Sequence, residues 1–271
     1  MNYHIDKNSW VVILDNFDFK CATQDDINII SQLISQHLVV VVRDQDLSVD
    51  DQLRIFKMFH NPYSFDPHNL QDGYVDGCVV ENSQGYILRV TAQLDEQGKP
   101  GFAPTNTDAI WHCDNPIRPA RKDITWLYAV SGAYGSRTSW INNALSYADL
   151  DENFKKNIEN LKCNMCDYTD KAPSRHQHTP YLVHINIAGV KGLYFPFESI
   201  LGIHNMPDAE SKLLLDQLKK HVVQEKYIYH HDWQDGDVVL AEQWLSIHQR
   251  WPTTDLKNRL LYRAIFDYVL V

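Results

Sequence analysis

The chain has 271 residues, a formal net charge of −10 and 44% hydrophobic residues, which is ordinary for a globular protein and enough for one large core. The negative charge and the absence of a Lys/Arg cluster argue against nucleic acid and anionic membranes as partners. No apolar run approaches membrane-spanning length and the start lacks a signal-peptide pattern, so we expect a cytoplasmic protein acting on a small molecule.

The first sixty residues predict two helices around a buried strand. The capping sequence Thr23–Asp26 opens an amphipathic helix that should end near 35–36. The mainly β-branched run 38–42 reads as a buried strand. A second capping sequence, Ser48–Asp51, opens a helix that ends near 59–60.

Residues 61–110 are rich in turn signals and contain few apolar pieces. Long irregular segments inside a compact domain commonly serve as lids over active sites. Because this segment leads directly into His112, we expect a lid-like insertion within a single domain that spans 1–271.

The rest of the chain predicts short strands and two further helices. The strands are expected at 123–130, 138–141, 181–185, 192–197, 226–232, 237–240 and 259–269, and the helices at 146–161 and 207–222. This mixture indicates an α+β fold with a sheet closed or folded on itself.

His112 and Asp114 are the first candidates for chemistry. In an extended strand, residues two apart point to the same face, so an imidazole and a carboxylate could bind one metal ion from one side. Two His and one carboxylate with open positions are typical of non-haem Fe(II) oxygenases. Such a pair also arises by chance, so a third ligand is required, and His248 is the candidate.

The five cysteines predict reduced thiols, because their number is odd and no export signal precedes them. Cys163 and Cys166 have the spacing of half a zinc site, but no second half accompanies them, and we interpret them as structural. Cys113 would face away from its two neighbouring ligands on a strand.

Two arginines lie in the apolar C-terminal strand, where Arg259, Leu261 and Arg263 would share one face. Buried guanidinium groups require anions, and their planar fork pairs well with a carboxylate. The two arginines therefore predict either a dicarboxylate bound beside a metal or two internal salt bridges.

These residues and several longer segments resemble the taurine dioxygenase family of Fe(II)/2-oxoglutarate oxygenases. The segment 42–47 resembles the family's N-terminal "RDQ…L", 135–140 its "GGDTxW", and 233–237 its "WxxGD". The matches follow one order over most of the chain. The resemblance implies a double-stranded β-helix, a distorted jelly roll flanked by helices.

By the same resemblance, His112, Asp114 and His248 would bind Fe(II). Thr138 and Arg259 would hold the distal carboxylate of the cosubstrate 2-oxoglutarate, and O2 would be the other cosubstrate. Substrate contacts are implied for Arg263 and Asp108. Trp244 lies where the chain departs from the family pattern, and it predicts either a wall of the pocket for an aromatic or bulkier substrate or a residue that only fills the core. The acidic residue at Asp114 argues against a halogenase, because members of the family that halogenate lack a carboxylate at this position.

The implied reaction oxidises an unactivated C–H bond of a small acidic substrate, by hydroxylation or desaturation, and converts 2-oxoglutarate to succinate and CO2. Departures from the family pattern at Arg137 and at 242–244, where the family often has Asp-Asn-Arg, argue against a sulfonate such as taurine as substrate.

Two alternatives stay open at this stage. One is an oxygenase of secondary metabolism that acts on an aromatic isonitrile acid by desaturation or decarboxylation. The other is a non-enzymatic metal-binding barrel, which would not need a carboxylate clamp beside the metal. The sequence leaves open whether the protein forms a homo-oligomer.

Overall fold

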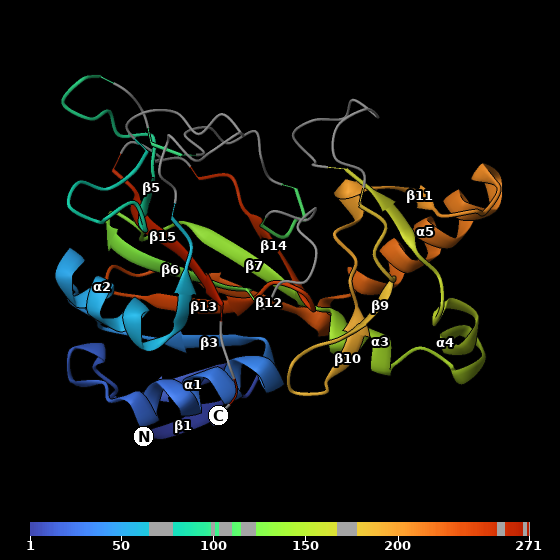
Figure 1. Cartoon of the computed structure of the whole chain (residues 1–271), viewed down its shortest axis with the longest axis horizontal. Helices are drawn as coiled ribbons and strands as arrows, with labels where there is room; N and C mark the ends of the chain where they lie inside the picture. The colour runs from blue at the N-terminus through green and yellow to red at the C-terminus, as the bar shows by residue number, and fades with distance from the viewer. Residues whose placement is uncertain are drawn as a thin grey trace.

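Two β-sheets of unequal size form the core of the fold (Figure 1). The computed structural model describes residues 1–64, 78–98, 101–102, 110–114, 123–166, 178–253, 258–267 and 270. Within these residues, the larger sheet has the order β1-β2-β3-β13-β6-β15-β4, with β5 also paired to β15. The smaller sheet has the order β12-β7-β14.

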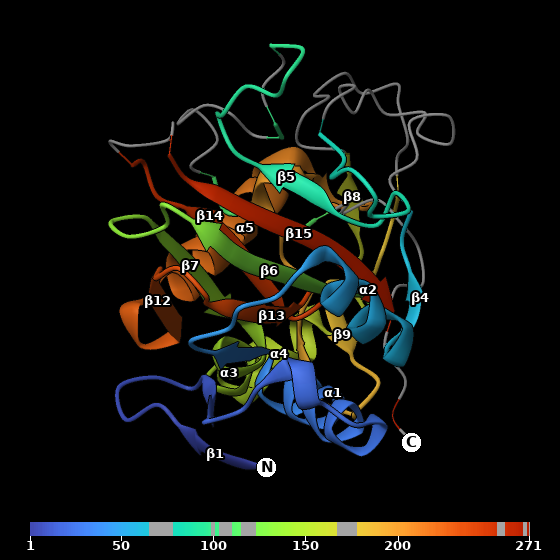
Figure 2. The same cartoon turned by 90° about the vertical axis from the view of Figure 1, so that its left-hand side faces the viewer.

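The strands of these sheets are short. The larger sheet contains β1 (Asn2–Ile5), β2 (Val12–Asp15), β3 (Val39–Val42), β4 (His60–Pro62), β5 (Leu88–Val90), β6 (Asp123–Ser131), β13 (Val238–Glu242) and β15 (Leu260–Asp267). The smaller sheet contains β7 (Arg137–Asn142), β12 (Ile228–Asp232) and β14 (Ser246–Arg250). Pairing is antiparallel except between β2 and β3. Figure 2 shows β5, β15, β6 and β13 side by side.

Helices α1 (Gln24–His37) and α2 (Val49–Met58) pack on one face of the larger sheet. Both begin with the predicted capping boxes, in which Thr23 and Ser48 bond the backbone three residues ahead. On the other face, a second buried cluster joins the two sheets, with Val41 from β3 and Trp140 from β7. The predicted α+β class with a jelly-roll core is confirmed.

Burial on both faces explains why the sequence of strand β3 is uniformly apolar. Val39 and Val41 belong to the cluster between the sheets, whereas Val40 and Val42 belong to the cluster under the helices. All four side chains are fully buried. A strand covered on both faces has no solvent-facing position, so the alternation typical of a surface strand is absent.

The prediction of one continuous helix at 146–161 is wrong. The structure has α3 (Asn143–Ala148) and α4 (Glu152–Ile158). The Asp151 side chain accepts hydrogen bonds from the backbone N–H groups of Asn153 and Phe154 and so starts a new helix. Apolar spacing alone continues across this break and does not reveal it.

The remaining elements lie at one end of the molecule, together with α3 and α4 (Figure 1). They are α5 (Asp208–Val222) and the strand pairs β8 (Cys163–Met165) with β11 (Ile200–Ile203) and β9 (Val183–Ile185) with β10 (Lys191–Leu193). Short 3-10 turns occur at Phe19–Cys21, Phe197–Ser199 and Glu225–Tyr227. Among the described helices, none has the length and apolar character needed to cross a membrane.

Candidate active site

A two-residue backbone bridge brings the predicted ligands together. The N–H of His112 donates to the carbonyl oxygen of His248 at 2.9 Å, and the N–H of His248 donates to the carbonyl oxygen of His112 at 2.7 Å. His248 lies in β14, opposite Trp140 of β7. The ligand segment around His112 is therefore a single bridge on β14, and not the regular strand that the sequence suggested.

His112, Asp114 and His248 form the metal-binding candidate. One ligand atom from each residue lies within 4.8 Å of the others, and these residues form the only such cluster of three or more in the part of the chain that is described. Two imidazoles and one carboxylate suit Fe(II), and they leave coordination positions for other ligands. The donor set thus fits the metal that the sequence predicted.

The ring orientation of His112 is set by a backbone carbonyl. Its Nδ1 lies 2.9 Å from the carbonyl oxygen of Ile110. A carbonyl only accepts, so Nδ1 carries the proton and the lone pair of Nε2 is left for a metal. Burial, followed by the nearby charge of His112, lowers the pKa of His248 to about 3, so this ring also has a free lone pair at neutral pH.

Asp114 is held from three sides. Arg263 pairs with both carboxylate oxygens, Nη2 with Oδ1 at 2.8 Å and Nε with Oδ2 at 3.2 Å. The hydroxyl of Thr125 donates to Oδ2 at 3.0 Å, and the backbone N–H of Asp114 donates to Oε1 of Gln243 at 2.9 Å. These contacts restrict both the backbone and the carboxylate of the ligand.

The same contacts keep Asp114 ionised. Burial alone would raise its pKa, but the charge of Arg263, the two histidines and the Thr125 hydrogen bond together lower the pKa well below its usual value. A carboxylate must be deprotonated to bind a metal, so the surroundings favour the binding form.

Arg259 differs from Arg263 in its partners. Its side chain is 2% exposed, and its Nε donates to Oγ of Ser136 at 3.1 Å. Within the described residues, no carboxylate pairs with this guanidinium. Burial, followed by the like charge of Arg250, lowers the pKa of Arg259 to about 9, so the group stays mainly cationic at neutral pH. Of the two arginines, one has an internal carboxylate and the other is available for a bound anion.

Thr138 lies on β7, two residues after Ser136, and is also buried. Its Oγ1 accepts a hydrogen bond of 2.9 Å from Nε1 of Trp233. Arg250 of β14, two residues after His248, stands opposite Thr138 in the sheet. The smaller sheet therefore links the metal ligand His248 to Thr138 through neighbouring strands.

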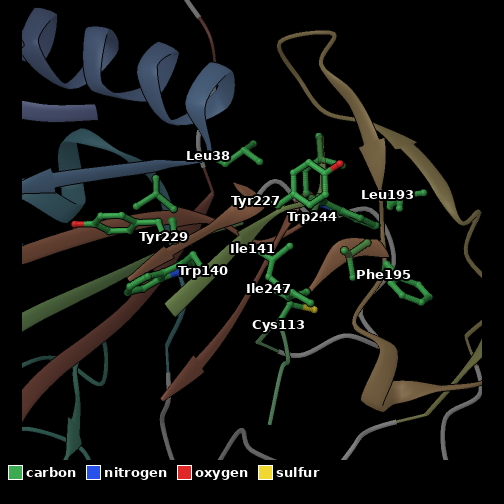
Figure 3. Close-up of a cluster of buried hydrophobic side chains, with 14 of the residues drawn as sticks. Leu38, Cys113, Trp140, Ile141, Leu193, Phe195, Tyr227, Tyr229, Trp244 and Ile247 are labelled. Carbon is green, nitrogen blue, oxygen red and sulfur yellow. The ribbon is translucent and has the colours of Figure 1, made fainter. Parts of the chain in front are cut away.

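Trp244 packs within the protein core. Its ring stacks on His184 with centroids 4.0 Å apart and contacts Tyr194 at 4.6 Å. Sγ of Cys113 lies 3.9 Å from the Tyr194 hydroxyl, in the same buried cluster (Figure 3). Cys113 thus packs into the core, as expected for a side chain pointing away from the ligands, and the described contacts of Trp244 are those of a core residue.

The other sequence candidates have simpler positions. Asp108 lies outside the described residues. Arg137 forms an exposed fork with Asp232, its partner across the sheet, at 2.6 and 2.8 Å. Cys163 and Cys166 are buried thiols, and burial raises the pKa of Cys163 to about 12, which disfavours the reactive thiolate.

Four residues that touch this site were not predicted as part of it: Thr125, Ser136, Trp233 and Gln243. Ser136 and Trp233 lie in the segments 135–140 and 233–237, which resemble the family. That resemblance could have marked both residues as part of the site. Gln243 lies in the segment 242–244, which departs from the family pattern, but its contact with Asp114 joins positions 129 residues apart and has no local signal. Thr125 is eleven residues from Asp114, and nothing in the sequence between them indicates the contact.

The chain is similar in sequence to known dioxygenases. Residues 8–265 match the family described as "Taurine catabolism dioxygenase TauD, TfdA family". A similar relative is the (S)-phenoxypropionate/alpha-ketoglutarate-dioxygenase of Sphingobium herbicidovorans, 23% identical over 84% of this chain and 82% of the relative. Another is pentalenolactone F synthase of Streptomyces avermitilis, 25% identical over 91% of this chain and 88% of the relative.

A solved structure has the same fold. The crystal structure of AAD-2 in complex with Mn(II) and N-oxalylglycine has a TM-score of 0.76 and 22% sequence identity, and the match covers 99% of this chain and 98% of that one.

Replacing Thr125 with Val removes one hydrogen bond to Asp114 and keeps the shape of the side chain. We expect Mn(II) to bind about 10- to 100-fold more weakly, because partners that orient metal ligands typically contribute this much. Isothermal titration of the metal-free protein measures the change. Ser31→Ala, which removes a buried hydroxyl from α1, is the control. Equal Mn(II) affinity in Thr125→Val and wild type would contradict the orienting role.

Proposed function

We propose that this chain, which belongs to the TauD, TfdA family of dioxygenases, hydroxylates an unactivated C–H bond of a small acidic substrate. The family and the named relatives make it an Fe(II)- and 2-oxoglutarate-dependent dioxygenase that uses O2. The C–H oxidation is coupled to the conversion of 2-oxoglutarate to succinate and CO2. Membership in this family answers the alternative of a non-enzymatic barrel.

The proposed metal ligands are His112, Asp114 and His248. When bound, Fe(II) supplies the redox chemistry with O2 that side chains lack. The chain would contribute two imidazole nitrogens and one carboxylate oxygen, which leaves coordination positions for the cosubstrate and O2. The contacts of Arg263 and Thr125 with Asp114 support a carboxylate that is oriented before the metal binds.

The single observation that carries the cosubstrate assignment is the buried guanidinium of Arg259. A buried charge without a partner is costly, and a bound carboxylate would compensate it. Thr138 lies on β7, two residues after Ser136, whose Oγ accepts from Nε of Arg259. A hydroxyl and a guanidinium can each donate to one carboxylate. We therefore propose that Arg259 and Thr138 bind the distal carboxylate of 2-oxoglutarate.

The proposed substrate carries an acidic group that Arg263 attracts. This guanidinium lies on Asp114, next to the metal ligands, and its Cζ is 5.5 Å from the ring centre of Phe102. The relative named for (S)-phenoxypropionate supports a carboxylic acid with an apolar body as the first class to screen. Asp108 is kept as a proposed substrate contact on resemblance alone, and no observation favours an isonitrile acid.

Arg259→Ala tests the cosubstrate assignment. Anaerobic Fe(II) and 2-oxoglutarate should give a weak charge-transfer band in the visible region, and the variant should need at least about tenfold more 2-oxoglutarate to form it. Arg137→Ala, which removes the exposed arginine of β7, should behave as wild type. A well-folded Arg259→Ala protein with unchanged 2-oxoglutarate affinity would contradict the assignment.

Arg263→Ala tests the substrate contact. Phenoxypropionate and its amide are compared by substrate-dependent succinate release at saturating Fe(II), so that weaker metal binding does not affect the result. If Arg263 binds the substrate anion, the wild type prefers the acid and the variant loses about tenfold or more of that preference. If the preference for the acid is the same in both proteins, Arg263 acts on Asp114 alone.

A further inference from the structure

Trp233 determines where the hydroxyl hydrogen of Thr138 can point. The indole Nε1–H of Trp233 donates to Oγ1 of Thr138 at 2.9 Å. A hydroxyl has one hydrogen and two lone pairs, and here a lone pair already accepts. The hydrogen therefore has to point away from the indole, and Thr138 is left as a donor to whatever binds beside it.

Ser136 fixes the partner of the Arg259 Nε–H group. The Ser136 hydroxyl donates to the carbonyl oxygen of Ala133 at 2.6 Å, so its oxygen accepts from Nε of Arg259 at 3.1 Å. The two terminal nitrogens of the guanidinium then remain for another acceptor. The backbone N–H of Trp233 also donates to the carbonyl oxygen of Ser136 at 3.0 Å. This bond connects the residue that contacts Thr138 to the residue that contacts Arg259.

A buried network holds the Trp233 ring in place. The ring packs edge-on against His231, with centroids 4.5 Å apart and an interplanar angle of 83°. His231 is fully buried between the Tyr229 hydroxyl, 2.9 Å from Nδ1, and the Asp237 carboxylate, 3.0 Å from Nε2. Arg43 forms an ion pair with the same Asp237 oxygen at 2.5 Å.

The hydrogen bonds of this network run in one direction. The Asp237 carboxylate paired with Arg43 only accepts, so Nε2 of His231 carries the proton and Nδ1 accepts from Tyr229. Burial lowers the pKa of His231, which favours this neutral ring. The ring that supports Trp233 therefore has one protonation state and one orientation.

We propose that Trp233 is a positioning residue that orients the Thr138 hydroxyl to donate into the cosubstrate pocket, so that the pocket favours a carboxylate over an amide. The terminal nitrogens of Arg259 can only donate, and the bond from Trp233 occupies one lone pair of Thr138 Oγ1 and turns its hydrogen away from the indole, so a carboxylate finds donors on both residues. The –NH2 of an amide would meet donors and lose hydrogen bonds. This inference rests on the proposal that Thr138 and Arg259 bind the distal carboxylate of 2-oxoglutarate.

The test compares 2-oxoglutarate with 2-oxoglutaramate, in which the distal carboxylate is an amide. Dissociation constants come from the anaerobic charge-transfer band of the Fe(II) protein. In Trp233→Phe, we expect 2-oxoglutarate to bind about fivefold or more weakly and the preference for the acid over the amide to fall by about tenfold. The affinity for Fe(II) should be unchanged, whereas a general structural defect would lower it as well.

Variants of Thr138 separate this inference from the proposed function. Thr138→Val should weaken 2-oxoglutarate binding, Thr138→Ser should restore it, and adding Trp233→Phe to Thr138→Val should cost nothing further. If Thr138→Val binds normally, the assignment of Thr138 in the proposed function fails. If Thr138→Val is weakened but Trp233→Phe keeps both affinity and selectivity, the inference about Trp233 is overturned.

A second measurement covers the case in which Trp233→Phe does not fold. With ¹⁵N-labelled tryptophan in the zinc-loaded protein, one indole N–H resonance should shift in Thr138→Val and stay in place in Thr138→Ser. That resonance should also move when 2-oxoglutarate is added to the wild type. Absence of any indole resonance that responds to both changes would overturn the inference.

Discussion

The backbone bridge between His112 and His248 is the constraint on which the rest of the site depends. Two hydrogen bonds place the segment that carries two ligands directly on the strand that carries the third. The bridge thereby fixes the backbone of His112 relative to the backbone of His248. The strand β14 then connects the ligands to β7, and through it to Thr138, by ordinary sheet pairing.

The two arginines of the C-terminal segment have different electrostatic partners. Arg263 compensates the buried carboxylate of Asp114, and Arg259 keeps a charge with no described carboxylate partner. A buried ion pair with both carboxylate oxygens engaged holds a ligand in one orientation, whereas a buried unpaired cation favours binding of an anion. From the sequence, two salt bridges and one bound dicarboxylate were alternatives; the structure shows one salt bridge, between Arg263 and Asp114, and among the described residues no carboxylate on Arg259.

Much of the site could be predicted because the relevant signals are local. A histidine and a carboxylate two residues apart, capping residues before apolar periodicity, and a uniformly apolar strand each report on their own neighbourhood. The family resemblance connected these local signals across the chain. Two of the segments that it marked are in contact, because Arg43 of the segment 42–47 forms an ion pair with Asp237 of the segment 233–237.

The remainder depends on contacts between distant segments. Strand β14 has the polar sequence Ser246–Arg250 and lacks an apolar alternation, so its pairing with β7 and with His112 carries the only sign that it is a strand. Thr125 and Gln243 act on Asp114 from β6 and from the turn after β13. The break between α3 and α4 depends on one capping aspartate within a continuous apolar pattern.

The central claim is that three side chains bind one metal beside a carboxylate pocket. A crystal structure of the protein with Mn(II) and the 2-oxoglutarate analogue N-oxalylglycine, with anomalous data, tests it most directly. We predict a single Mn(II) peak bound by His112, Asp114 and His248, with the distal carboxylate of the analogue on Arg259 and Thr138. A metal peak elsewhere, or an analogue whose distal carboxylate does not contact Arg259, would contradict the account.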